Sequence, residues 1–110
     1  MRLAVVVAIA LAACQSSDVS RELGARCDRS VECDERCLMP SNDWPEGFCT
    51  IACETDLDCP ESAVCLEEEG GVCAFSCTAD PQCEFLGPGY SCKERDARGG
   101  AGKRMVCRGG

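Results

Sequence analysis

Hydrophobic residues are distributed very unevenly along this chain. One unbroken apolar run extends from Leu3 to Ala13, directly after Arg2. A run of this length falls well short of the roughly 20 residues that a transmembrane helix needs, but it fits the apolar core of a secretory signal peptide. The pattern therefore predicts a signal peptide over residues 1–13.

The segment that follows has neither helical nor strand periodicity. Residues 15–26 read "QSSDVSRELGAR", with few bulky side chains. Such a segment predicts a flexible tether, whose reach as a coil is about 20 Å. We therefore expect the folded domain to begin at Cys27.

Apolar residues stay sparse in the rest of the chain. Between Cys27 and Gly110, only sixteen positions are Val, Leu, Ile, Met, Phe, Tyr or Trp. That supply cannot offset about 1.5 kcal/mol of conformational entropy per ordered residue. A disulfide that closes a loop of about 15 residues contributes on the order of 3 kcal/mol instead. We therefore expect a small disulfide-rich fold with little regular secondary structure. Its short strands should lie near residues 47–51 and 71–75, with turns at Pro60, at Gly70 and Gly71, and at Pro88 and Gly89.

The cysteines are spaced as a repeat. From Cys27 onward, the gaps between them are 5, 3, 11, 3, 5, 5, 7, 3, 5, 8 and 14 residues. Units that open with Cys-x5-Cys cover about 27–49, 53–73 and 77–107. The stretch "GFCTIACETDLDC" aligns without gaps on "GVCAFSCTADPQC", 24 residues later. Internal repetition of this kind predicts a tandem array within a cysteine-rich domain over residues 27–110.

The pairing of the cysteines is not fixed by their spacing, because four cysteines allow three pairings. Our working hypothesis joins the first to the third and the second to the fourth in each unit. The pairs are then Cys27–Cys37, Cys33–Cys49, Cys53–Cys65, Cys59–Cys73, Cys77–Cys92 and Cys83–Cys107.

The end of the apolar run, "LAAC" at residues 11–14, resembles the lipobox of bacterial lipoproteins. The resemblance implies cleavage after Ala13 and attachment of palmitate-like acyl chains to Cys14, which would anchor the protein to a membrane. Gln15 and Ser16 then resemble an outer-membrane sorting signal, so we expect a cell-envelope protein that faces the periplasm or the cell surface. The alternative is an ordinary secretory signal followed by a chance cysteine. Lipid on Cys14 would leave twelve of the 13 cysteines, an even number suited to disulfides in an oxidising compartment.

The units themselves resemble short cysteine-rich repeats of bacterial secreted proteins, and they are similar to the Dickkopf N-terminal type of module. The resemblance rests on the Cys-x-x-Asp-x-x-Cys openings and the Gly-x-Cys endings. The first unit departs from it with Ser30 in place of the aspartate, and the third ends in "RMVC".

The candidate chemistry is sparse. The chain has no histidine and no Cys-x2-Cys pair, so we expect no zinc, no other cofactor and no enzymatic activity. Asp56 and Asp58 lack the spacing of a calcium loop, so weak binding is the most they predict. Asp56 and Asp80 are alternatively turn-capping residues. Glu67–Glu69, which the other units lack, are expected to be solvated loop.

The charges are segregated along the chain. Eleven acidic and no basic residues lie between Cys37 and Cys92, whereas six basic and two acidic residues lie from Lys93 onward. The simplest interpretation is that both groups of charges lie on a solvated surface. The functional interpretation is a dipolar module whose basic end meets an anionic surface or another copy, and the acidic body argues against a nucleic-acid partner.

The only tryptophan, Trp44, lies in the long loop of the first unit. It is a candidate binding contact, or alternatively it folds back over a disulfide. The sequence thus favours a non-enzymatic, lipid-anchored module that binds protein or glycan. An inhibitor of extracellular proteases is the alternative, with the Trp44 loop or residues 98–104 as bait. A redox or metal-binding protein ranks third.

Overall fold

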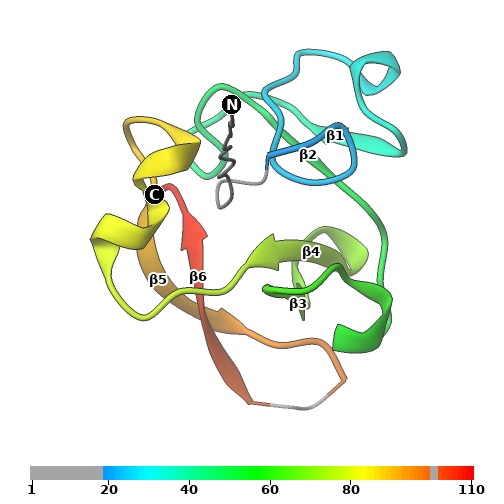
Figure 1. Ribbon diagram of the computed structural model, residues 1–110. Helices are drawn as coiled ribbons and strands as arrows, with labels where there is room; N and C mark the ends of the chain where they lie inside the picture. Colours follow the sequence, from blue (N-terminus) through cyan, green and yellow to red (C-terminus); the bar gives the residue numbers. More distant parts are fainter. Residues whose placement is uncertain (1–18, 100–101) are drawn as a thin grey trace, which may run out of the picture.

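The computed structural model describes residues 19–99 and 102–110, and it shows a small disulfide-rich fold made of three antiparallel hairpins joined by loops (Figure 1). Each expected unit contributes one hairpin. The hairpins are β1 (Arg36–Leu38) with β2 (Phe48–Thr50), β3 (Ala63–Leu66) with β4 (Val72–Phe75), and β5 (Ser91–Asp96) with β6 (Lys103–Arg108). None of the helices in the described part of the chain is long and apolar enough to cross a bilayer.

The third and fourth cysteines of each unit lie directly opposite one another in the hairpin, but they do not bond to each other. Each is instead bonded to one end of the preceding Cys-x5-Cys loop, so two disulfides fasten that loop onto the hairpin. The arrangement is first-to-third and second-to-fourth, as in our working hypothesis. The six bonds are Cys27–Cys37, Cys33–Cys49, Cys53–Cys65, Cys59–Cys73, Cys77–Cys92 and Cys83–Cys107.

A 3-10 helix begins within each Cys-x5-Cys loop, and in the third unit it continues past Cys83. The helices are η1 (Ser30–Glu32), η2 (Asp56–Asp58) and η4 (Asp80–Leu86), and a fourth, η3 (Glu68–Gly70), lies in the β3–β4 loop. The residue before the second cysteine caps each loop. Asp58, for example, accepts hydrogen bonds from the backbone N–H groups of Glu54 and Thr55, at 2.8 and 3.2 Å. Glu32 and Gln82 occupy the same position in the other units.

A second repeated contact ties the loop to the hairpin. Asp56 Oδ1 accepts a hydrogen bond from the backbone N–H of the third cysteine, Cys65, at 2.9 Å, and Asp80 does the same for Cys92. These aspartates therefore reach across their units and do not only cap their own turns. Ser30 Oγ lies 3.4 Å from the backbone N of Cys37, which explains how a serine substitutes for the aspartate in the first unit.

The closing glycines are required by close backbone packing. Gly47 and Gly71 have φ values of 82° and 107°, which disfavour any side chain. A β-carbon on either glycine would also collide with the carbonyl oxygen of the first cysteine in its unit, Cys27 or Cys53. The third unit has Met105 at this place, inside β6, where no left-handed backbone is needed.

The three units share one hydrophobic core. Phe48 is fully buried at its centre, with its ring centroid 4.9 Å from that of Trp44. It also lies 6.3 Å from the ring of Phe75 in the second unit and 6.3 Å from that of Tyr90 in the third. Burial raises the pKa of Tyr90, whose hydroxyl donates to the Pro45 carbonyl at 3.0 Å. The three repeats therefore form one domain and not three independently packed units.

The expected tether differs from the structure between residues 19 and 26. Leu23 is buried, and Ser20 and Gly24 form a β-bridge. Gly24 N–H donates to the Cys49 carbonyl at 2.8 Å, and Cys49 N–H donates to Ala25 at 2.9 Å. The expectation that the domain begins at Cys27 is therefore wrong, because this segment buries a leucine and hydrogen-bonds to the first unit.

Candidate functional site: a charged junction between the units

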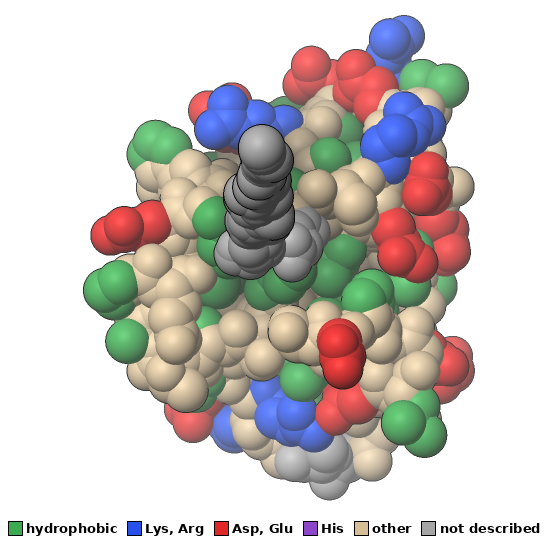
Figure 2. Space-filling model, viewed as in Figure 1, with side chains coloured by type: hydrophobic (Ala, Val, Ile, Leu, Met, Phe, Trp, Pro, Cys, Tyr) green, Lys and Arg blue, Asp and Glu red, His purple; other side chains and the backbone are tan. Residues whose placement is uncertain are grey.

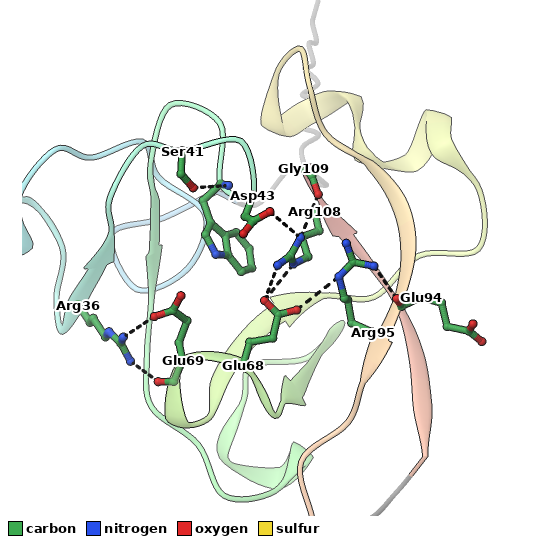
Figure 3. A network of polar contacts seen from close by, with 10 residues as sticks. Arg36, Ser41, Asp43, Glu68, Glu69, Glu94, Arg95, Arg108 and Gly109 are labelled. Carbon is green, nitrogen blue, oxygen red and sulfur yellow. Dashed lines mark hydrogen bonds and ion pairs between the residues drawn. The ribbon is translucent and has the colours of Figure 1, made fainter.

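The glutamate run in the β3–β4 loop is the place where the three units meet (Figure 3). Each of its three side chains faces an arginine of a neighbouring unit. Figure 3 shows Glu68 with Arg108 at 2.6 Å and with Arg95 at 3.5 Å, and Glu69 with Arg36 at 3.2 Å. The remaining pair is Glu67 with Arg98, at 3.7 Å. The run was expected to be solvated loop, and it is instead a set of inter-unit contacts. We call Asp43, Trp44, Glu68, Arg95 and Arg108 the junction.

Arg108 is the centre of the junction. Its side chain is only 9% exposed, and that of Glu68 is 20% exposed. Arg108 also donates to Asp43 Oδ1 at 3.2 Å, and its guanidinium carbon lies 5.4 Å from the Trp44 ring centroid, at a distance suited to a cation–π contact. Burial alone would lower the pKa of Arg108. The hydrogen bonds that Arg108 donates to Glu68, together with the charges of Glu68 and Asp43, outweigh that effect and raise the pKa.

Trp44 is not an exposed binding anchor, because only 3% of it is accessible to solvent. The candidate binding contact is thus corrected: the indole packs on Phe48 and under the Arg108 guanidinium. Its Nε1 has no hydrogen-bond partner within residues 19–99 and 102–110. The alternative interpretation was that Trp44 folds back over a disulfide of its own unit. Trp44 does fold inward, but the core that it joins is shared by all three units.

Open hollows lie beside the junction and elsewhere on the surface. One of about 340 Å³ is lined by Met39, Trp44 and the paired side chains Arg36 and Glu69. A second, of about 370 Å³, lies near Arg26 and Glu46, and a third, of about 290 Å³, lies near Leu57 and Arg98. These volumes are at the lower end of the range for small-molecule sites.

The carboxylates considered for calcium are occupied within the fold. Asp56 pairs with Arg104 and accepts from the Cys65 N–H, while Asp58 binds backbone N–H groups, which lower its pKa. In the described ranges, the groups of three potential metal ligands that lie close together are all disulfide-bonded cysteines. Half-cystines have no thiolate to offer a metal.

The segregated charges of the sequence are brought together by folding. Arg98 pairs with Glu54 and Glu67, and Arg104 pairs with Asp56, so the basic end of the chain lies against the acidic middle unit. Figure 2 accordingly shows basic and acidic side chains next to one another at the rim of the visible face. The same pairing directs both arginines of the hypothetical bait loop toward the protein's own surface.

Sequence reasoning missed two groups of residues. The loop caps at Glu32, Asp58 and Gln82 could have been found, because an acceptor side chain recurs immediately before the second cysteine of each unit. Arg108 carries no such signal, since its partners Asp43 and Glu68 lie 65 and 40 residues away. Cys14, the predicted lipidation site, lies outside the described residues.

Comparisons of the chain with protein-family models, curated proteins and solved structures find no match. The class of protein is therefore the one that its own fold defines. It is a small cysteine-rich, disulfide-bonded domain with a charged junction at its centre.

Proposed function

We propose that this protein is a non-enzymatic, lipid-anchored module of a bacterial cell envelope that binds a protein or a glycan. The observation that carries the proposal is the "LAAC" sequence at residues 11–14, which follows the apolar run and lies only four residues before Val19, the first residue that the structure describes. Lipid on Cys14 would hold the domain at a membrane, since each buried CH2 group of an acyl chain contributes about 0.8 kcal/mol.

The disulfide framework supports an extracytoplasmic location. Six disulfides join twelve cysteines, and such bonds persist in oxidising compartments. The remaining cysteine is Cys14, which the lipobox resemblance assigns to the acyl chains. Within a double-membraned envelope, Gln15 and Ser16 favour the outer membrane.

A binding role fits the surface better than catalysis does. The chain has no histidine to act as a general base, and the best-placed acids and arginines neutralise one another in the junction. Six disulfides keep the loops in one conformation, which lowers the entropy cost of binding a partner. A formal net charge of −8 argues against nucleic acid as that partner.

The mass of the protein extracted from bacterial membranes tests the anchor. We expect a chain that begins at Cys14, carries acyl groups and contains six disulfides. The Cys14→Ser variant should leave the membrane fraction while keeping the same disulfides. An unmodified Cys14 in a chain released to the medium would contradict the proposal.

Binding is tested separately with a soluble fragment that starts at Gln15. Because Leu23 belongs to the core, a fragment starting at Cys27 would be less stable and is a poor reagent. The oxidised fragment should retain envelope proteins or glycans that its reduced and alkylated form does not. Equal retention by the two forms would count against recognition by the folded surface.

A further inference from the structure

A small apolar patch surrounds the point where the described chain begins. Val19 is 41% exposed and Phe85, in η4, is 37% exposed. Phe75 bridges them: its ring meets that of Phe85 edge-on at 5.0 Å, and a β-carbon on Gly24 would lie 2.8 Å from Phe75 Cε2 and 3.0 Å from Val19 Cγ1. We call Val19, Gly24, Phe75 and Phe85 the entry face.

The chain between Cys14 and the entry face is short. Whatever its conformation, five residue steps span at most about 18 Å between the Cα atoms of Cys14 and Val19. The tether expected from the sequence is longer, but residues 19–26 are built into the domain and add no reach.

This length restricts how the domain can lie on a membrane. A globular domain of about 90 residues is roughly 30 Å across. To turn the far side toward the bilayer, the chain would have to run around the domain, a path of more than twice what residues 14–19 can span. Only the side that carries Val19 is therefore able to rest on the membrane that holds Cys14.

The composition of this side suits an interfacial position. Transfer of Phe and Val side chains out of water is favourable, and aromatic rings are enriched at the bilayer interface. An exposed arginine, Arg26, lies at the edge: a β-carbon on Gly87, two residues after Phe85, would be 2.9 Å from its Nη2. A guanidinium there is placed to meet lipid phosphate groups.

We propose that the entry face rests on the surface of a lipid bilayer, with Phe85 and Val19 in the headgroup region. The proposal depends on the proposed lipidation of Cys14, which supplies the affinity, whereas the entry face supplies the orientation. The hollow near Leu57 and Arg98, beside η2, is then turned toward the aqueous compartment, where a partner is able to reach it.

Hydroxyl-radical footprinting of the full, processed chain in vesicles of phosphatidylethanolamine and phosphatidylglycerol tests this orientation. The reference is the Cys14→Ser protein with the same vesicles present. We expect Phe85 and Val19 to be labelled about three times more slowly in the lipidated protein, because lipid excludes the radical. Leu57 is the internal control, since it is 94% exposed and lies in η2, on the opposite side of the molecule from η4 (Figure 1).

The outcomes separate the two proposals. If Cys14 carries lipid and the protein floats with the vesicles, but Phe85 is labelled as fast as in the reference, the orientation is wrong and the anchor stands. Protection of Leu57 in place of Phe85 would also overturn the orientation. If Cys14 carries no lipid and the protein does not float, the proposed function fails, and the inference that depends on it fails as well.

Discussion

The β3–β4 hairpin of the second unit and the β5–β6 hairpin of the third have the same disulfide arrangement but carry side chains of opposite charge at the contact between them. In both, two cysteines face each other across the strands and bond to the preceding loop. The β3–β4 hairpin carries Glu67, Glu68 and Glu69 at its turn. The β5–β6 hairpin carries four arginines, which are Arg95, Arg98, Arg104 and Arg108. The disulfides thus shape each unit, and the charged side chains that vary between repeats add contacts between units that also share a core and β-bridges.

The glutamate run Glu67–Glu69 contains both a buried and an exposed contact within three consecutive residues. Glu68 is largely buried against Arg108, while 59% of the Glu67 side chain is exposed beside Arg98. Exposed ion pairs contribute little to stability, whereas removing one partner of a buried pair is costly. The burial of each glutamate, and not its charge alone, should therefore decide the effect of its replacement.

The largest effect should come from removing a disulfide from either hairpin. Replacing Cys59 and Cys73 by alanine opens a bridge with a sequence separation of 14, which should cost about 3 kcal/mol of unfolding free energy. Because the units share one core, hydrogen exchange should accelerate in β6 as well as in β3 and β4. Exchange that accelerates in the second unit alone would show that the units fold independently.

Neutralising the buried glutamate should be nearly as damaging. Glu68→Gln leaves the Arg108 guanidinium buried with only Asp43 as an anionic partner, and it should cost about 3 kcal/mol in urea unfolding followed by Trp44 fluorescence. Glu67→Gln is the matched control, with an expected loss of at most about 1 kcal/mol. Equal losses for the two variants would refute the difference between buried and exposed positions.

Two neighbouring glycines at the turn of the second hairpin separate backbone strain from steric collision. Both Gly70 and Gly71 have positive φ, but a β-carbon on Gly70 meets nothing within 4 Å, whereas one on Gly71 collides with the Cys53 carbonyl. Thermal or urea unfolding should show that Gly71→Ala costs about 2 kcal/mol more than Gly70→Ala. If the two substitutions cost the same, the collision does not explain the Gly-x-Cys motif.

The smallest effect should be the loss of a loop cap at low pH, and it should appear in the second unit but not in the third. Backbone hydrogen bonds lower the pKa of Asp58 below its ordinary value of 3.8, so its cap stabilises the fold above that pH and is lost as the pH falls further. Gln82, the corresponding cap in the third unit, does not titrate. Below this pH, amide exchange at Thr55 should rise relative to Ala79, and Asp58→Asn should abolish the pH dependence of that ratio.

The repeated parts of the fold were predictable from the sequence. Cysteine spacing indicates three units, the shared glycines place strands β2 and β4, and prolines and glycines mark the turns at Pro60, Gly70 and Pro88. These features depend on residues close together in the chain. Local spacing and backbone preference are sufficient to specify them.

The parts that escaped prediction depend on distant residues. Strands β5 and β6 read "SCKERD" and "KRMVCR", without the apolar alternation of a half-buried strand. Trp44 is buried because Phe48, Arg108 and the other units surround it, and Leu23 is buried because its neighbours bond to Cys49. The site was missed for the same reason, since a glutamate run does not reveal which arginines it will meet.

A double-mutant cycle on Glu68 and Arg108 tests most directly whether the junction joins the units. The oxidised forms of wild type, Glu68→Gln, Arg108→Met and the double variant would be unfolded in urea, so that the Asp43 contact cancels between the arms of the cycle. We predict a coupling free energy of about 2 kcal/mol or more for this largely buried pair. Losses that add to within about 0.5 kcal/mol would contradict the claim that this contact holds the second and third units together.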